Sequence, residues 1–148
     1  MTAAWPAVVD RLVGLLPTLP DWSGVTVYDG PPVTADAPPE YVTVGFVDGV
    51  DFGGTYEQAR GPGDCPEELG TVRSEVVAWT GDTDLPGLRA RGFELVNAWE
   101  RALHNDPTLG VLPQGSTASL AVDVAPAQTT AGAVQRLTVT LTYTARCY

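Results

Sequence analysis

Lysine is absent from this chain of 148 residues, and all eight of its basic residues are Arg, against eighteen acidic residues. The formal net charge is -10. A surface with this balance repels the phosphates of nucleic acids, so the basic patch of an ordinary DNA- or RNA-binding protein is excluded. Solubility alone is another explanation for the acidic excess, and the sequence does not place these charges on a particular surface.

Cysteine and histidine are scarce. The two cysteines, Cys65 and Cys147, are too few for a disulfide framework or a zinc site, which favours a reducing compartment. The single histidine, His104, stands in "ALHND" at the end of an expected helix, where a cation or a capping donor is favoured. No Ser-His-Asp or Cys-His arrangement surrounds it, so we predict no catalytic residue.

Long apolar runs are missing as well. The opening "MTAAWPAVVDRLVGLLPTLP" lacks a basic leader and carries Asp10 and Arg11 inside its apolar stretch, so we do not expect a signal peptide. No other run reaches about 18 apolar residues, the length of a membrane span. The segments "GPG" and "GG" lack the Lys-Ser/Thr context of a phosphate loop. We therefore expect a cytosolic chain without a membrane partner and without a cofactor.

Two helices are predicted from apolar residues that recur at helical spacing. The first has Thr2 as its expected N-cap and Pro17 as its stop. The second, in "LRARGFELVNAWERALHND", begins after Thr83 or Asp84 and ends before Pro107. The apolar residues of the first are Trp5, Val8, Val9, Leu12, Leu15 and Leu16, and those of the second are Leu88, Leu95, Val96, Trp99, Ala102 and Leu103.

Gly92 lies on the apolar stripe of the second helix, where glycine disfavours the helix by about 1 kcal/mol. A close approach of this helix to a sheet explains why a glycine is tolerated there.

Five strands are expected in "VTVYDG", "YVTVGFV", "SEVVAWTG", "SLAVDVAP" and "VQRLTVTLTYTARC". The order helix, three strands, helix, two strands predicts an α+β fold, in which two helices cover one face of a mixed or mostly antiparallel sheet of about five strands. The last strand alternates strictly, and its Thr-rich face suits either water or another subunit. Its inward residues are Leu137, Val139, Leu141, Tyr143 and Ala145, and its outward residues are Thr138, Thr140, Thr142, Thr144 and Arg146.

We expect one domain over residues 1–148, with a long loop at about 48–73. Residues 48–68 carry six carboxylates and a single Arg. The aromatic residues in this loop argue against simple disorder, so it is either a partner-binding arm or a solvated excursion. Two acidic pairs, Asp48 with Asp51 and Asp82 with Asp84, lack the full calcium-loop pattern, which favours solvated turns over a metal site.

The order of elements, the length, and phrases such as "VYDGPP" and "VVAWTGD" resemble the tail terminator proteins of long-tailed, siphovirus-type bacteriophages. Similar small proteins are encoded in the head-to-tail joining regions of actinobacterial phages and prophages. The resemblance implies a structural virion protein and not an enzyme. In that family, a homo-hexameric ring caps the tail tube protein, ends tube polymerisation and meets the head-tail connector or stopper protein.

The resemblance also implies that DNA passes through the ring without specific binding. It places the chain at the head-proximal end of the virion tail, assembled in the host cytoplasm. Two other functions remain open: another neck component, such as a connector or stopper, and a metal-dependent hydrolase that uses carboxylates of the acidic loop. The residues expected at a subunit or tail-tube interface are Asp48, Asp51, Phe52, Tyr56, Glu57, Arg60, Arg136 and Arg146.

Overall fold

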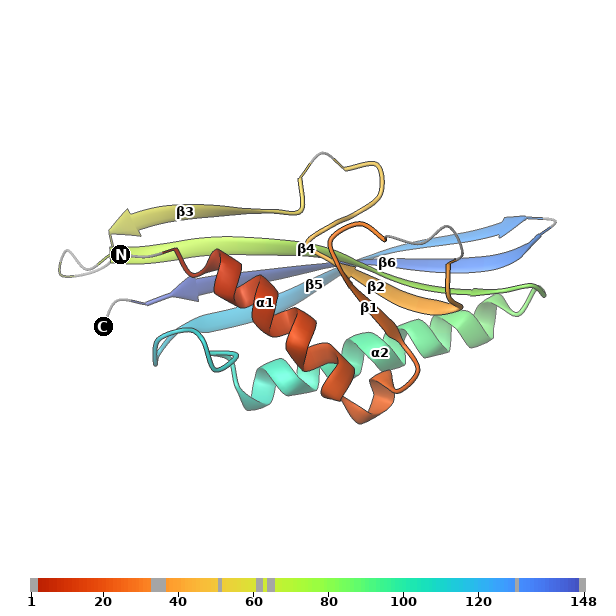
Figure 1. The fold of residues 1–148 in the computed structure, drawn as a ribbon, viewed down its shortest axis with the longest axis horizontal. Helices are drawn as coiled ribbons and strands as arrows, with labels where there is room; N and C mark the ends of the chain where they lie inside the picture. The colour runs from red at the N-terminus through yellow and green to blue at the C-terminus, as the bar shows by residue number, and fades with distance from the viewer. Residues whose placement is uncertain are drawn as a thin grey trace.

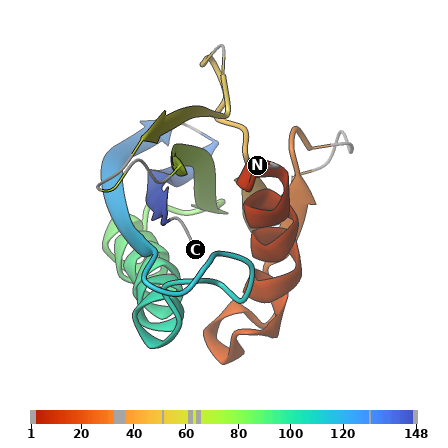
Figure 2. The same cartoon turned by 90° about the vertical axis from the view of Figure 1, so that its left-hand side faces the viewer.

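A six-stranded, mostly antiparallel sheet carries two α-helices on one face (Figures 1 and 2). The computed structural model describes residues 3–32, 37–50, 52–60, 63, 66–129 and 131–146. The strand order is β1-β2-β4-β6-β5, with β3 paired to β4 outside this path. Only β1 and β2 pair in parallel among the described strands. The predicted α+β class with helices on one face is confirmed.

The elements follow the chain in a simple order. The helices are α1 (Trp5–Leu15) and α2 (Leu85–Asn105), and two 3-10 turns, η1 (Leu16–Thr18) and η2 (Pro20–Trp22), follow α1. The strands are β1 (Thr26–Asp29), β2 (Glu40–Val44), β3 (Gly54–Arg60), β4 (Pro66–Thr80), β5 (Thr117–Thr129) and β6 (Gly132–Ala145).

The ends of the helices agree with the local sequence. The Asp84 carboxylate caps α2 and accepts a hydrogen bond from the Gly87 N–H at 3.1 Å. Thr2, the cap expected for α1, lies outside the described residues, and Ala4 occupies the cap position.

Gly92 faces the sheet, where an added Cβ would lie 2.9 Å from Leu137 Cδ1. The expected close approach of α2 to the sheet is confirmed.

The alternation of β6 is also confirmed. Its inward side chains are at most 2% exposed, and they join the helices in one apolar core. Its threonines lie on the helix-free face and are half-buried or exposed. A shift of one residue would turn the whole apolar set to water, so the pattern fixes the register of this strand.

The prediction of a long loop at about 48–73 is wrong for most of this range. Residues Gly54–Arg60 form β3, and β4 begins at Pro66 rather than near residue 74. The two strands make an antiparallel hairpin from the pair Gly54–Val72 to the pair Arg60–Pro66. Because β3 exposes side chains on both faces, it lacks the apolar alternation that marks a half-buried strand.

The length of β4 gives the sheet two different ends. Along one edge of β4, β2 pairs with residues 75–78 and β3 pairs with residues 66–72. Along the other edge, β6 pairs with residues 68–80. The hairpin end is therefore a four-stranded antiparallel sheet in the order β3-β4-β6-β5, which Figure 1 shows on its left side.

Candidate assembly surface

The β3–β4 hairpin presents two large apolar side chains to solvent. Tyr56 is 58% exposed and points to the helix side of the sheet, in the same row as Gly70. Leu69 is also exposed, but it lies on the face of the sheet that carries no helix, where it pairs with Glu57 of β3. Tyr56, Glu57 and Arg60, which the sequence suggested for an interface, therefore lie together on β3.

A buried carboxylate anchors β4 near the turn of this hairpin. Glu68 is fully buried, and its two oxygens accept hydrogen bonds from the Ala4 N–H at 2.9 and 3.0 Å. The Tyr143 O–H donates to the same carboxylate at 2.6 Å. Burial, reinforced by Glu68, raises the pKa of Tyr143 above its ordinary value. One side chain of β4 thus joins the start of α1 to β6.

Two further contacts make this junction rigid. The Trp5 Nε1–H donates to the Thr71 carbonyl oxygen at 2.7 Å. Gly70 leaves room for the Tyr143 ring, because an added Cβ would lie 2.2 Å from Tyr143 Cζ. From the sequence, Glu68 is expected to be one of several charges of a solvated loop or arm. The alternation Glu68, Gly70, Val72 continues the buried face of β4 and was the available signal.

Phe52 lies over the helix-free face. The Arg73 guanidinium carbon stands 5.1 Å from the centre of the Phe52 ring, a cation–π arrangement. The backbone N–H of Arg73 also donates to the Gly53 carbonyl oxygen at 2.7 Å. About half of the Phe52 side chain remains open to solvent. The neighbouring candidate Asp51 lies outside the described residues.

Asp48 and Arg136 meet farther along the sheet. They border a small hollow of about 220 Å³ with Glu75, and Arg136 Nη1 lies 2.8 Å from Glu75 Oε1. Burial raises the pKa of the Glu75 carboxyl, an effect that the Arg136 charge opposes and Asp48 reinforces. Arg136 therefore pairs within its own chain.

Arg146 is also paired within the chain. Its side-chain Nη1 lies 3.3 Å from Glu67 Oε1, and its backbone N–H donates to Ser116 Oγ at 3.1 Å. Its side chain is nevertheless 47% exposed. The seven predicted interface residues that the structure describes are therefore not one cluster. Three lie on β3, Phe52 lies beside Arg73, Asp48 and Arg136 line the same small hollow, and Arg146 directly follows β6.

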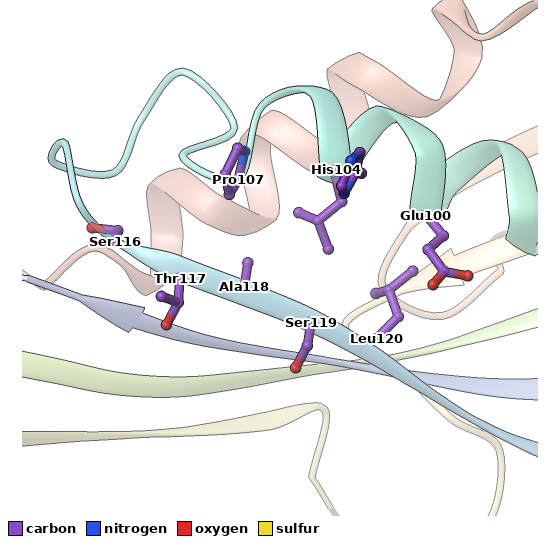
Figure 3. A pocket seen from close by; sticks show the side chains of 9 residues that line it. Glu100, His104, Pro107, Ser116, Thr117, Ala118, Ser119 and Leu120 are labelled. Carbon is purple, nitrogen blue, oxygen red and sulfur yellow. The ribbon is translucent and has the colours of Figure 1, made fainter.

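A hollow that the sequence analysis did not anticipate lies between the end of α2 and the start of β5 (Figure 3). Its volume is about 370 Å³. Glu100 and His104 face it from successive turns of α2, and Ala118 and Leu120 point toward α2 from β5, which forms the floor. Its lining is Glu100, Leu103, His104, Pro107, Ser116, Thr117, Ala118, Ser119 and Leu120. The run of small residues at 116–119 was the only sequence signal.

The hairpin end of the sheet has two open borders. Within the described residues, no strand pairs with the outer edge of β3 or with that of β5. Open edges expose N–H and C=O groups that can pair with another chain.

No group of three or more His, Cys, Asp and Glu in the described part of the chain is arranged to hold a metal ion. None of the described helices is long and apolar enough to cross a membrane.

No protein-family model matches this chain, and no curated protein sequence matches it.

Proposed function

We propose that this chain is a structural virion protein of the tail terminator type. Six copies form a ring that caps the tail tube, ends its polymerisation and meets the head-tail connector or stopper protein. The ring stands at the head-proximal end of the tail and is assembled in the host cytoplasm. The resemblance in the order of elements, in length and in short sequence segments supports this proposal, and the α+β fold is compatible with it.

The observation that carries the proposal is the pair of open edges on opposite borders of one sheet. Such edges, β3 on one side and β5 on the other, provide two different surfaces for head-to-tail contact. Head-to-tail contacts close into rings when the rotation between copies allows it. A symmetric dimer, by contrast, would use one surface twice.

The charge of the chain supports a conduit for DNA. A net charge of -10 disfavours binding to the phosphate backbone, so DNA would slide through the ring without being held. The helix-free face of β6 offers threonine side chains, which are polar without being charged.

Sedimentation velocity over a wide range of concentration, with negative-stain imaging of the same samples, tests the ring. We expect hollow six-fold particles. A monomer at every concentration would contradict the proposal. Purified rings should then be added to growing tubes of the tail tube protein from a long-tailed phage. Shorter tubes with a particle at one end support the terminator function, whereas rings that leave tube length unchanged indicate another neck component.

A further inference from the structure

The geometry points to one specific contact between neighbouring copies in the ring. We propose that β3 of one copy pairs with β5 of the next, and that Tyr56 enters the hollow between α2 and β5. This inference rests on the proposed function, because it describes how the ring is joined. The occupant of the hollow is a second copy of this chain.

The register of the sheet places the two surfaces at the same level. Tyr56 pairs with Gly70, Gly70 with Tyr143, and Tyr143 with Ala118. These four residues form one row across the sheet and share its helix side. When copies are related by rotation about an axis parallel to the strands, Tyr56 of one copy arrives beside Ala118 of the next.

The directions of the strands also fit. Each neighbouring pair in the order β3-β4-β6-β5 is antiparallel, so β3 and β5 run in opposite directions. A β3 strand from the next copy therefore meets β5 as an antiparallel partner and continues the alternation of the four-stranded sheet. The main-chain groups of both edges gain hydrogen-bond partners, as in strand addition generally.

The hollow suits a tyrosine. Ala118 lines it beside Leu103 and Pro107, which provide apolar contact for a ring, and His104 supplies a polar group near the hydroxyl (Figure 3). A tyrosine combines an apolar body with a polar tip, and such side chains are favoured at interfaces. This pairing would bury Tyr56, one of the most exposed large side chains among the described residues.

The sequence of β5 favours pairing at the half of its edge that lies beside the hollow. Residues 117–122, which adjoin the hollow, contain neither a charge nor a proline, whereas the far half carries Asp123 and Pro126. Charges and prolines discourage pairing on an edge strand. On the helix-free face, Glu57 arrives level with Thr117 of the neighbouring copy, which pairs with Thr144, two residues before Arg146. The Glu57 carboxylate therefore shares this face with the half-exposed Arg146 guanidinium.

A cysteine pair tests this contact in the full chain. In a background of Cys65→Ser and Cys147→Ser, we would combine Tyr56→Cys with Ala118→Cys and oxidise the assembled rings. Within one chain these positions are separated by three strand spacings, about 14 Å, and a disulfide needs Cα atoms about 4.4–6.8 Å apart. Cross-links must therefore join different copies.

We expect a ladder of covalent oligomers that ends at six copies and collapses on reduction. The matched control replaces Ala118→Cys with Val124→Cys, on the same face but six residues, about 20 Å, along β5, and should give no ladder. Rings that form without a ladder at position 118, or with an equal ladder in the control, overturn this contact but leave the ring. A correctly folded parent chain, with Tyr56 in place, that never assembles overturns the ring itself and this contact with it.

Discussion

At the residue scale, the Glu68–Tyr143 pair should stabilise the fold. Tyr143→Phe removes a donor that lies 2.6 Å from a buried carboxylate, and hydrogen bonds to charged groups are worth about 1.5–3 kcal/mol. We expect the free energy of unfolding in urea to fall by a similar amount. The control Thr142→Ala lies next to it on the exposed face and should change stability by less than about 0.5 kcal/mol. Equal effects of the two substitutions would remove this role for the pair.

The same tyrosine gives a pH dependence. Its pKa is raised above 10.0, so the folded chain keeps this proton when the unfolded chain has lost it. Stability is fully present below pH about 10 and should decline above it, with a slope of up to about 1.4 kcal/mol per pH unit from this group. In Tyr143→Phe the decline between pH 9 and 11 should be shallower. Parallel unfolding curves for the two proteins would contradict the assignment.

At the element scale, two glycines in helices should respond in opposite directions. Gly14 in α1 is exposed and has no atom near an added Cβ, so Gly14→Ala should stabilise the fold by about 0.5–1 kcal/mol. Gly92 in α2 gains the same helix propensity, but its new methyl group meets the fully buried Leu137. Overpacking costs about 1–3 kcal/mol, so Gly92→Ala should be neutral or destabilising by up to about 2 kcal/mol.

Thermal and urea unfolding of both variants measure this difference. A stabilising Gly92→Ala would mean that α2 can move away from β6 without loss. The contrast depends on the sheet beneath α2, because the two glycines have the same intrinsic preference.

At the scale of the whole molecule, Arg146→Glu should weaken ring formation without unfolding the chain. The Arg146 side chain is 47% exposed, although that of Glu67 is only 14% exposed, and ion pairs open to solvent contribute about 0–1 kcal/mol. The substitution also places a second carboxylate beside Glu67 and, in the proposed contact, on the same face as Glu57 of the neighbour. Sedimentation velocity under matched conditions should therefore show a higher concentration for half-assembly.

The control is Arg89→Glu, which makes the same charge change on an exposed position of α2. Assembly of this variant should remain close to that of the parent chain. If both substitutions weaken assembly equally, the cause is overall charge. If Arg146→Glu assembles as well as the parent, Arg146 has no part in the interface.

The sequence by itself determined the elements whose signal is local. Periodic apolar residues identified α1, α2 and β6, and a cap at Asp84 marked the start of a helix, because each pattern is complete within one short segment. The order of these segments was enough for an α+β fold with both helices on one face. Gly92 was recognised as a close approach, since glycine is costly in a helix unless packing requires it.

Only the tertiary structure decided what depends on partners far away in the chain. β3 became a strand because β4 offered it an edge, and Glu68 became a buried anchor because Tyr143, 75 residues later, donates to it. The row from Tyr56 to Ala118 arises from three successive strand pairings, none of which a local pattern records. Local periodicity reports which face of an element is buried, but pairing between edges depends on which strands meet.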